Sequence, residues 1–167
     1  NILTPIYDME RNMKEFVFGL YRLEVDVEAT RAYYEAHPGP WITCSCDGCR
    51  NFARAAGKLP QAVTDFFHTL GLDPEKPGEL MYYQGTPETL SGGGWYHLVG
   101  RVAEGSSKPG DDEVLPAEWY DLAEGFSVGF KTECDLLPDD FPRPCFQMEF
   151  EHVMPWVLNE PNPYIYE

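Results

Sequence analysis

The stretch from Cys145 to Met154 reads CFQMEFEHVM, with a hydrophobic side chain at every second position from Phe146 to Phe150. A period of two residues places Phe146, Met148 and Phe150 on one face of an extended chain, as in a β-strand with one buried side. Three other segments in the second half have this period and are rich in aromatic and branched residues: Glu79 to Tyr83, Trp95 to Ala103 and Phe126 to Cys134. We therefore predict four strands in this half of the chain.

The first half of the chain combines one predicted strand with three short amphipathic helices. Glu15 to Val25 is rich in aromatic and branched residues, which favours a strand. Apolar residues then recur with helical spacing in three segments, each with a recognisable start or end signal. These segments run from the N-cap residue Asp26 to Ala36, from Cys49 to Ala56 before Gly57, and from Pro60 to Leu70 before Gly71.

The order of these elements predicts an α+β fold in a single domain. No predicted helix separates the strands of the second half. We therefore expect a mainly antiparallel sheet of about five strands, with about three short helices on one side. A length of 167 residues suits one domain with one core. The expected extended tails are residues 1–14 and 159–167, and the expected loops are Gln84–Gly94, Glu104–Pro116 and Asp135–Pro144.

The chain carries 28 acidic and 12 basic residues, which gives a formal net charge of -16. Nucleic acid is an unfavourable partner for such a chain, because binding to phosphates depends on Lys and Arg. The charge also opposes anionic membranes, and no apolar run approaches the roughly 18 residues needed to span a bilayer. A basic protein is the kind of partner that this charge attracts.

Five cysteines are an odd number, and three of them lie within six positions, as Cys44-Ser-Cys46-Asp-Gly-Cys49. Disulfide frameworks usually have an even number of cysteines. The sequence also contains no Asn-x-Ser/Thr acceptor, and no signal peptide is visible at its N-terminus. We therefore expect a location in the reducing cytoplasm.

The Cys46-x-x-Cys49 spacing is typical of a zinc knuckle, because a tight turn brings both thiolates to one ion. Cys44 is a third expected ligand, two residues upstream. Zinc is therefore the expected cofactor. A structural zinc site has four ligands. The candidates for the fourth are Cys134, Cys145 and His97.

Two other interpretations of the three cysteines stay open. A Cys-x-x-Cys pair at a helix N-terminus can be redox-active or nucleophilic, here with His97 as the assisting base and Asn51 as its orienting group. The cysteines can equally be buried and unreactive. The leading hypothesis is a non-enzymatic binding or interaction protein. The first alternative is a thiol enzyme or redox protein that uses Cys46 or Cys49, and the second is an acidic, immunity-like inhibitor of a basic protein.

Four segments together resemble a family of small uncharacterised bacterial proteins. They are Cys44-x-Cys46-x-x-Cys49-x-Asn51-Phe52, Leu70 to Pro74, Gly93 to Gly100 and Pro155 to Leu158. The resemblance extends from about Phe16 to Leu158, and the cysteine segment is its most specific part. It implies a bacterial cytosol and carries no activity or catalytic role.

Overall fold

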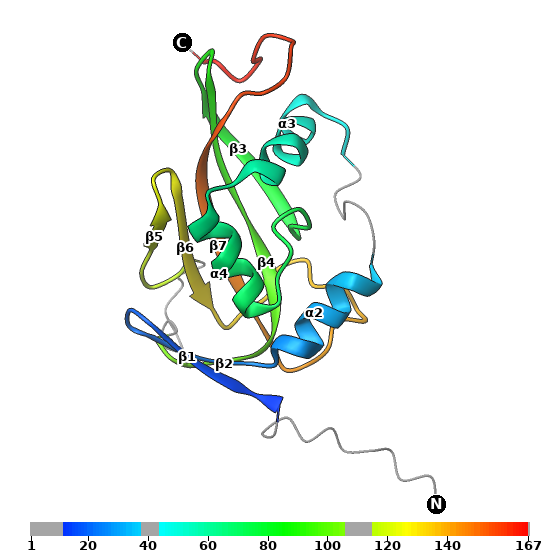
Figure 1. Cartoon of the computed structure of the whole chain (residues 1–167), viewed down its shortest axis with the longest axis vertical. Helices are drawn as coiled ribbons and strands as arrows, with labels where there is room; N and C mark the ends of the chain where they lie inside the picture. Colours follow the sequence, from blue (N-terminus) through cyan, green and yellow to red (C-terminus); the bar gives the residue numbers. More distant parts are fainter. Residues whose placement is uncertain (1–11, 38–43, 106–114, 167) are drawn as a thin grey trace, which may run out of the picture.

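The computed structural model describes residues 12–37, 44–105 and 115–166. Within these ranges, seven strands form one antiparallel sheet, accompanied by three α-helices and a short 3₁₀ helix (Figure 1). The strands are β1 (Lys14–Phe18), β2 (Tyr21–Val25), β3 (Glu79–Gly85), β4 (Thr89–Glu104), β5 (Tyr120–Ala123), β6 (Phe126–Lys131) and β7 (Cys145–Pro155). The helices are α2 (Val27–Ala36), α3 (Asp47–Ala55), η1 (Ala56–Lys58) and α4 (Gln61–Leu70). No helix in the described ranges is long and apolar enough to cross a membrane.

The 16-residue strand β4 is the centre of the sheet. One of its edges pairs with β7 from Thr89 to Val99. Its other edge is shared, because β3 pairs with the first half of β4 and β2 with the last residues. Helix α2 lies between these two partners: the Tyr34 hydroxyl donates to the carbonyl of His97 at 2.7 Å and accepts from its N–H at 3.0 Å. The resulting strand order is β1-β2-β4-β7-β6-β5, with β3 added on β4.

The hydrophobic core lies between the sheet and the helices α3 and α4, which pack on the same face (Figure 1). Tyr96 of β4 and Phe150 of β7 are buried there. The ring of Phe67 from α4 meets Tyr96 edge-on at 4.8 Å, and the ring of Phe52 from α3 lies 6.1 Å from Phe150. The alternation that predicted β7 is confirmed, and its hydrophobic residues face the helices.

The sheet has seven strands and not about five, and one reason is an additional turn near the N-terminus. The segment Glu15–Val25, predicted as one strand, is the hairpin of β1 and β2. Gly19 has a φ of 58°, which lets the chain reverse direction there. The neighbouring N–H of Leu20 donates to the hydroxyl of Tyr120 at 2.9 Å. Tyr120 belongs to β5, the other strand that the sequence did not predict.

The predicted loop Gln84–Gly94 is wrong at both ends, because Gln84 and Gly85 belong to β3 and Thr89 to Gly94 lie within β4. A Cβ atom on Gly92 would collide with the carbonyl of Met81, and one on Gly94 with the carbonyl of Glu79. The glycines therefore allow β3 and β4 to approach closely, as glycine does where two backbones meet.

The three predicted helices are confirmed, with small differences at their ends. Asp26 caps α2 by accepting from the N–H of Ala29 at 3.0 Å, and Gly71 ends α4 with a φ of 84°. Helix α3 begins at Asp47, earlier than the apolar pattern suggested, with Cys46 as its N-cap. Strand β6 ends at Lys131 and does not reach Cys134.

The segment after β7 packs against the β3–β4 hairpin. The side-chain amide of Asn162 donates to the carbonyls of Thr86 and Thr89 at 2.9 and 3.0 Å. The carbonyl of Tyr164 accepts from the N–H of Gly85 at 2.8 Å. The expected C-terminal tail is thus bound to the sheet over its described part. Of the expected N-terminal tail, residues 1–11 lie outside the described ranges.

Candidate metal centre

Cys44, Cys46 and Cys49 come together at the N-terminus of α3. Their three Sγ atoms all lie within 4.8 Å of one another. Cys44 is exposed, Cys46 and Cys49 are half-buried, and none of the three forms a disulfide. The group could therefore hold a metal ion, as the spacing predicted.

Each of the three sulfur atoms accepts a hydrogen bond from a different donor. The N–H of Cys46 donates to Cys44 Sγ and the N–H of Cys49 donates to Cys46 Sγ, both at 3.5 Å. The hydroxyl of Tyr82 donates to Cys49 Sγ at 3.1 Å. Hydrogen bonds to sulfur favour the thiolate, which is the form in which cysteine binds metals.

Two tyrosines from distant segments surround the cysteines. Tyr82 comes from β3, and a Cβ on Gly48 would stand 2.5 Å from its ring, so the glycine allows α3 to lie close to the sheet. Tyr164, from the segment after β7, accepts a hydrogen bond from the N–H of Gly48 at 3.2 Å. The two tyrosine rings lie 5.4 Å apart. The site therefore joins α3, β3 and the C-terminal segment.

The thiols of Cys46 and Cys49 differ in acidity. Burial raises the pKa of Cys46, but hydrogen bonds from the N–H of Cys49 and from neighbouring side chains outweigh this and lower the pKa to about 7. Burial raises the pKa of the Cys49 thiol to about 12, and the hydrogen bond from Tyr82 only partly offsets that effect. Cys46 is therefore the first of the two to become a thiolate.

Arg50 offsets the acidic residues next to this group. Its guanidinium lies 2.7 Å from a carboxylate oxygen of Asp47 and 2.9 Å from one of Glu160. These pairs are partly exposed, so their contribution to stability is small. Arg50 compensates one of the two carboxylate charges next to the cysteines, and it links the first turn of α3 to Glu160 in the segment after β7.

The three residues predicted as a fourth ligand lie in other groups. Among the described residues, no other His, Cys, Asp or Glu joins Cys44, Cys46 and Cys49 in the group that could hold a metal ion. Cys134 and Cys145 contact each other, with 3.8 Å between their sulfur atoms. The Nε2 atom of His97 lies 3.0 Å from the side-chain oxygen of Gln147.

The alternation of side chains along the strands explains this separation. Tyr96 and Phe146 point toward the helices, so the neighbouring His97 and Cys145 point to the opposite face of the sheet. Helix α3 and its cysteines lie on the helix-covered face. The sequence contains this alternation, but it does not show which face α3 covers.

Asn51 has a structural role in place of the orienting role that a thiol enzyme would require. Its buried side chain donates to the carbonyl of Pro155 at 3.1 Å and accepts from the N–H of Val157 at 2.7 Å. These bonds attach α3 to the end of β7. Because His97 points to the other face of the sheet, the predicted arrangement of a cysteine with His97 and Asn51 is not formed.

The face of the sheet opposite the helices holds a buried polar network that the sequence did not predict. Gln147 accepts from the N–H of Asp135 at 2.7 Å and donates to carboxylates of Asp135 and Glu149 at 3.0 and 3.1 Å. Lys131 lies 2.6 Å from Asp135 and 3.3 Å from Glu149, and only 6% of its side chain is exposed. The alternating pattern suggests solvent at these positions, but the segment after β6 covers them.

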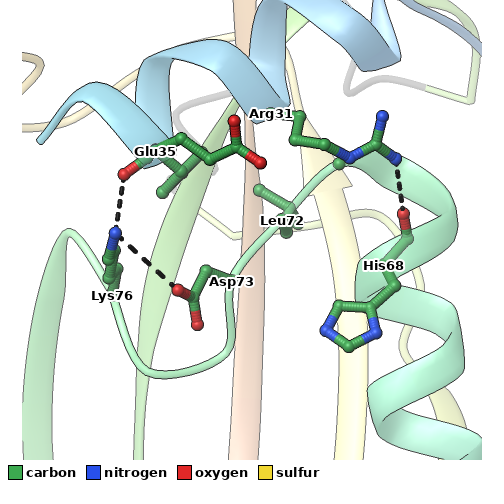
Figure 2. A pocket seen from close by; sticks show the side chains of 8 residues that line it. Arg31, Glu35, His68, Leu72, Asp73 and Lys76 are labelled. Atoms are coloured by element: carbon green, nitrogen blue, oxygen red, sulfur yellow. Dashed lines mark hydrogen bonds and ion pairs between the residues drawn. The ribbon is translucent and has the colours of Figure 1, made fainter. Parts of the chain in front are cut away.

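A cavity of about 200 Å³ lies between α2 and the turn after α4 (Figure 2). Its two cationic side chains already bind groups of the fold. Arg31 donates to the carbonyl of His68 at 3.3 Å, and Lys76 donates to the carbonyl of Tyr34 at 2.6 Å and lies 3.8 Å from Asp73. We therefore assign this cavity to the packing of α2 and not to a ligand.

Comparison with known proteins gave no relative to guide the interpretation of the site. No protein-family model, curated protein or solved structure matches this chain. The resemblance inferred from the sequence motifs stays a prediction.

Proposed function

We propose that the chain is a non-enzymatic interaction module whose fold is stabilised by a zinc ion bound to Cys44, Cys46 and Cys49. The observation that carries this proposal is the approach of the three Sγ atoms to within 4.8 Å of one another. Sulfur ligands of one tetrahedral zinc ion lie about 3.8 Å apart, given Zn–S bonds of about 2.3 Å, so movements of about 1 Å complete the geometry. Thiolates favour zinc and other soft ions over magnesium or calcium.

The surroundings of the cysteines support a structural role for the ion. Helix α3 has nine residues, and its N-cap acceptor is the sulfur of Cys46. An ion bound there would hold the start of the helix against Tyr82 and Tyr164. The fourth coordination position falls to water or to a side chain of another molecule, and the exposed Cys44 marks the side open to solvent.

Elemental analysis of the full chain, purified without added metal, tests the proposal. We expect about one zinc ion per chain, and a lower melting temperature after treatment with a chelator. The Cys44→Ser/Cys46→Ser/Cys49→Ser variant should lose both the zinc and the chelator effect, whereas Cys134→Ser/Cys145→Ser should keep both. A zinc content near zero, with no change in stability after adding zinc, would reject the proposal.

The acidity of Cys46 favours a second candidate, thiol chemistry at the same group. A pKa of about 7 gives this residue a substantial thiolate fraction at neutral pH, as reactive cysteines require. The candidates make different predictions in the presence of zinc. Zinc bound to the thiolates blocks Cys46 in both cases, so stability distinguishes the candidates: zinc should raise the melting temperature of a chain with a structural site, whereas a thiol enzyme should be equally stable without it.

The formal charge of -16 supports a basic protein as the partner of the module. Isolation of complexes from the native cell at two salt concentrations tests this part. A partner that stays bound equally well at high salt would contradict an electrostatic interface.

A further inference from the structure

We propose that Cys134 and Cys145 form a reversible disulfide by exchange with a small-molecule disulfide such as oxidised glutathione. Both residues lie outside the three-cysteine group, so this inference does not depend on zinc binding. Their Sγ atoms are 3.8 Å apart, and the thiol of Cys134 donates a hydrogen bond to the sulfur of Cys145. A disulfide bond is about 2 Å long, so the two sulfur atoms have to approach by about a further 2 Å to form one.

Strand pairing holds the two cysteines in this arrangement. Cys145 is the first residue of β7, and the register of β6 and β7 pairs Lys131 with Gln147. The chain that leaves β6 therefore passes the start of β7. Asp135, next to Cys134, is fixed there by Lys131 at 2.6 Å and by Gln147 at 2.7 Å. Once one of the two sulfur atoms carries a mixed disulfide, the neighbouring thiol attacks it faster than a thiol from solution does.

The environment of the pair distinguishes the two thiols. The hydrogen bond from Cys134, together with the positive charge of Arg143, lowers the pKa of Cys145 to about 7. Burial raises the pKa, but its effect is outweighed. The same hydrogen bond and burial raise the pKa of Cys134. Both residues are half-buried and thus within reach of a small molecule. Cys145 is therefore the attacking thiolate, and Cys134 is the thiol that resolves the intermediate.

The exchange occurs in two steps, with oxidised glutathione as the oxidant and without a metal ion. The Cys145 thiolate attacks one sulfur of oxidised glutathione, forms a mixed disulfide and releases one glutathione thiolate. Cys134 then gives up its proton and attacks the sulfur of Cys145, which forms the Cys134–Cys145 bond and releases the second glutathione thiolate. Two electrons pass from the two protein thiols to oxidised glutathione, and the two protons end on two molecules of reduced glutathione.

The crosslink closes the segment from Cys134 to Cys145. This segment contributes Leu136, Pro138 and Asp140 to a cavity of about 330 Å³ that His97 also lines. The Nε2 of His97 is bound to Gln147, whereas its Nδ1 is buried without a hydrogen-bond partner. Oxidation therefore fixes one wall of this cavity, and it should raise the melting temperature by several degrees because it restricts the unfolded chain.

The test uses the Cys44→Ser/Cys46→Ser/Cys49→Ser variant, which keeps only Cys134 and Cys145. We expect incubation with oxidised glutathione to lower its intact mass by two hydrogens, without a glutathione adduct, and peptide mapping to locate the Cys134–Cys145 crosslink. Reduced glutathione in excess should reverse the change. Adding Cys134→Ser should trap glutathione on Cys145, whereas adding Cys145→Ser should slow adduct formation at Cys134 by at least about tenfold at pH 7.

Two results would overturn the proposal. One is the accumulation of two separate glutathione adducts, and the other is a crosslink that forms only in urea. If the triple variant does not fold, peptide mapping of the oxidised natural chain gives the same information. A chain that binds no zinc can still form this crosslink, and a zinc-binding chain can fail to form it, so the two proposals are tested separately.

Discussion

The two cysteine groups of this protein each contain one acidic thiol, yet they suit different chemistry. Cys46 and Cys145 both have a pKa lowered to about 7. Cys46 has two further sulfur atoms within 4.8 Å, whereas Cys145 has one neighbour at 3.8 Å. Three converging thiolates can coordinate an ion, but two adjacent thiols can form a disulfide. The number and arrangement of the neighbouring sulfur atoms, and not the acidity of one thiol, therefore distinguish the groups.

The groups also differ in how the chain brings them together. The first lies within six consecutive residues and depends on the start of one helix. The second depends on the pairing of β6 with β7. Zinc binding should therefore respond to changes at the start of α3 and in the residues that contact it, and disulfide formation to changes in β6 and β7.

The largest expected effect is the loss of zinc binding when a ligand is removed. Cys49→Ser should weaken zinc binding by more than about 100-fold, because loss of a ligand should exceed the 10–100-fold effect typical of outer-shell residues. Cys145→Ser should leave the affinity unchanged. Competition with a chromogenic chelator measures both. Equal loss in the two variants would mean that the groups are not independent.

The next effect concerns the attachment of α3 to β7. Asn51→Ala leaves the carbonyl of Pro155 and the N–H of Val157 without their partner, which should lower the free energy of unfolding by about 2 kcal/mol. Asn159→Ala is the matched control, because Asn159 is exposed. Urea denaturation measures the difference. Equal stability of the two variants would show that Asn51 does not anchor the helix that carries the cysteines.

Removal of a hydrogen bond to sulfur should have a smaller effect. Tyr82→Phe removes the hydrogen-bond donor to the sulfur of Cys49. It should weaken zinc binding by about tenfold, which is the lower end of the 10–100-fold effect typical of residues that hydrogen-bond to a metal ligand. Tyr83→Phe, in the next position of β3, should have no effect on the affinity. The same chelator competition measures the affinity, and peptide mapping after treatment with oxidised glutathione should show unchanged disulfide formation in both variants.

The smallest effect is the pH dependence of alkylation. In zinc-free, reduced protein, the alkylation rates of Cys46 and Cys145 should rise about fivefold between pH 6 and pH 7, because the thiolate fraction grows with pH, and should level off above about pH 8. Added zinc should suppress alkylation of Cys46 and leave that of Cys145 unchanged. Peptide mass spectrometry after iodoacetamide treatment separates the two sites, and suppression at both would contradict the separation of the groups.

Local patterns in the sequence were sufficient to predict most of the helices and strands and the grouping of Cys44, Cys46 and Cys49. Hydrophobic periods identified β7 and the three helices, and the Cys-x-Cys-x-x-Cys spacing identified three cysteines that the fold brings close enough to hold a metal ion. Both are short-range features, because a helix turn or a strand alternation involves only residues a few positions apart. The hairpin at Gly19 and the strand nature of Ser91–Gly94 were missed, because glycine is common in turns and also occurs where two backbones approach closely.

The sequence by itself determined the class of fold, the acidity of the chain and the proximity of Cys44, Cys46 and Cys49. Only the tertiary structure decided that Cys134 lies beside Cys145, that Asn51 supports β7, and that Lys131 and Gln147 are buried. The physical reason is that these contacts depend on strand register and on which face of the sheet each loop covers. Many distant residues fix these features together, and no short stretch of sequence contains them.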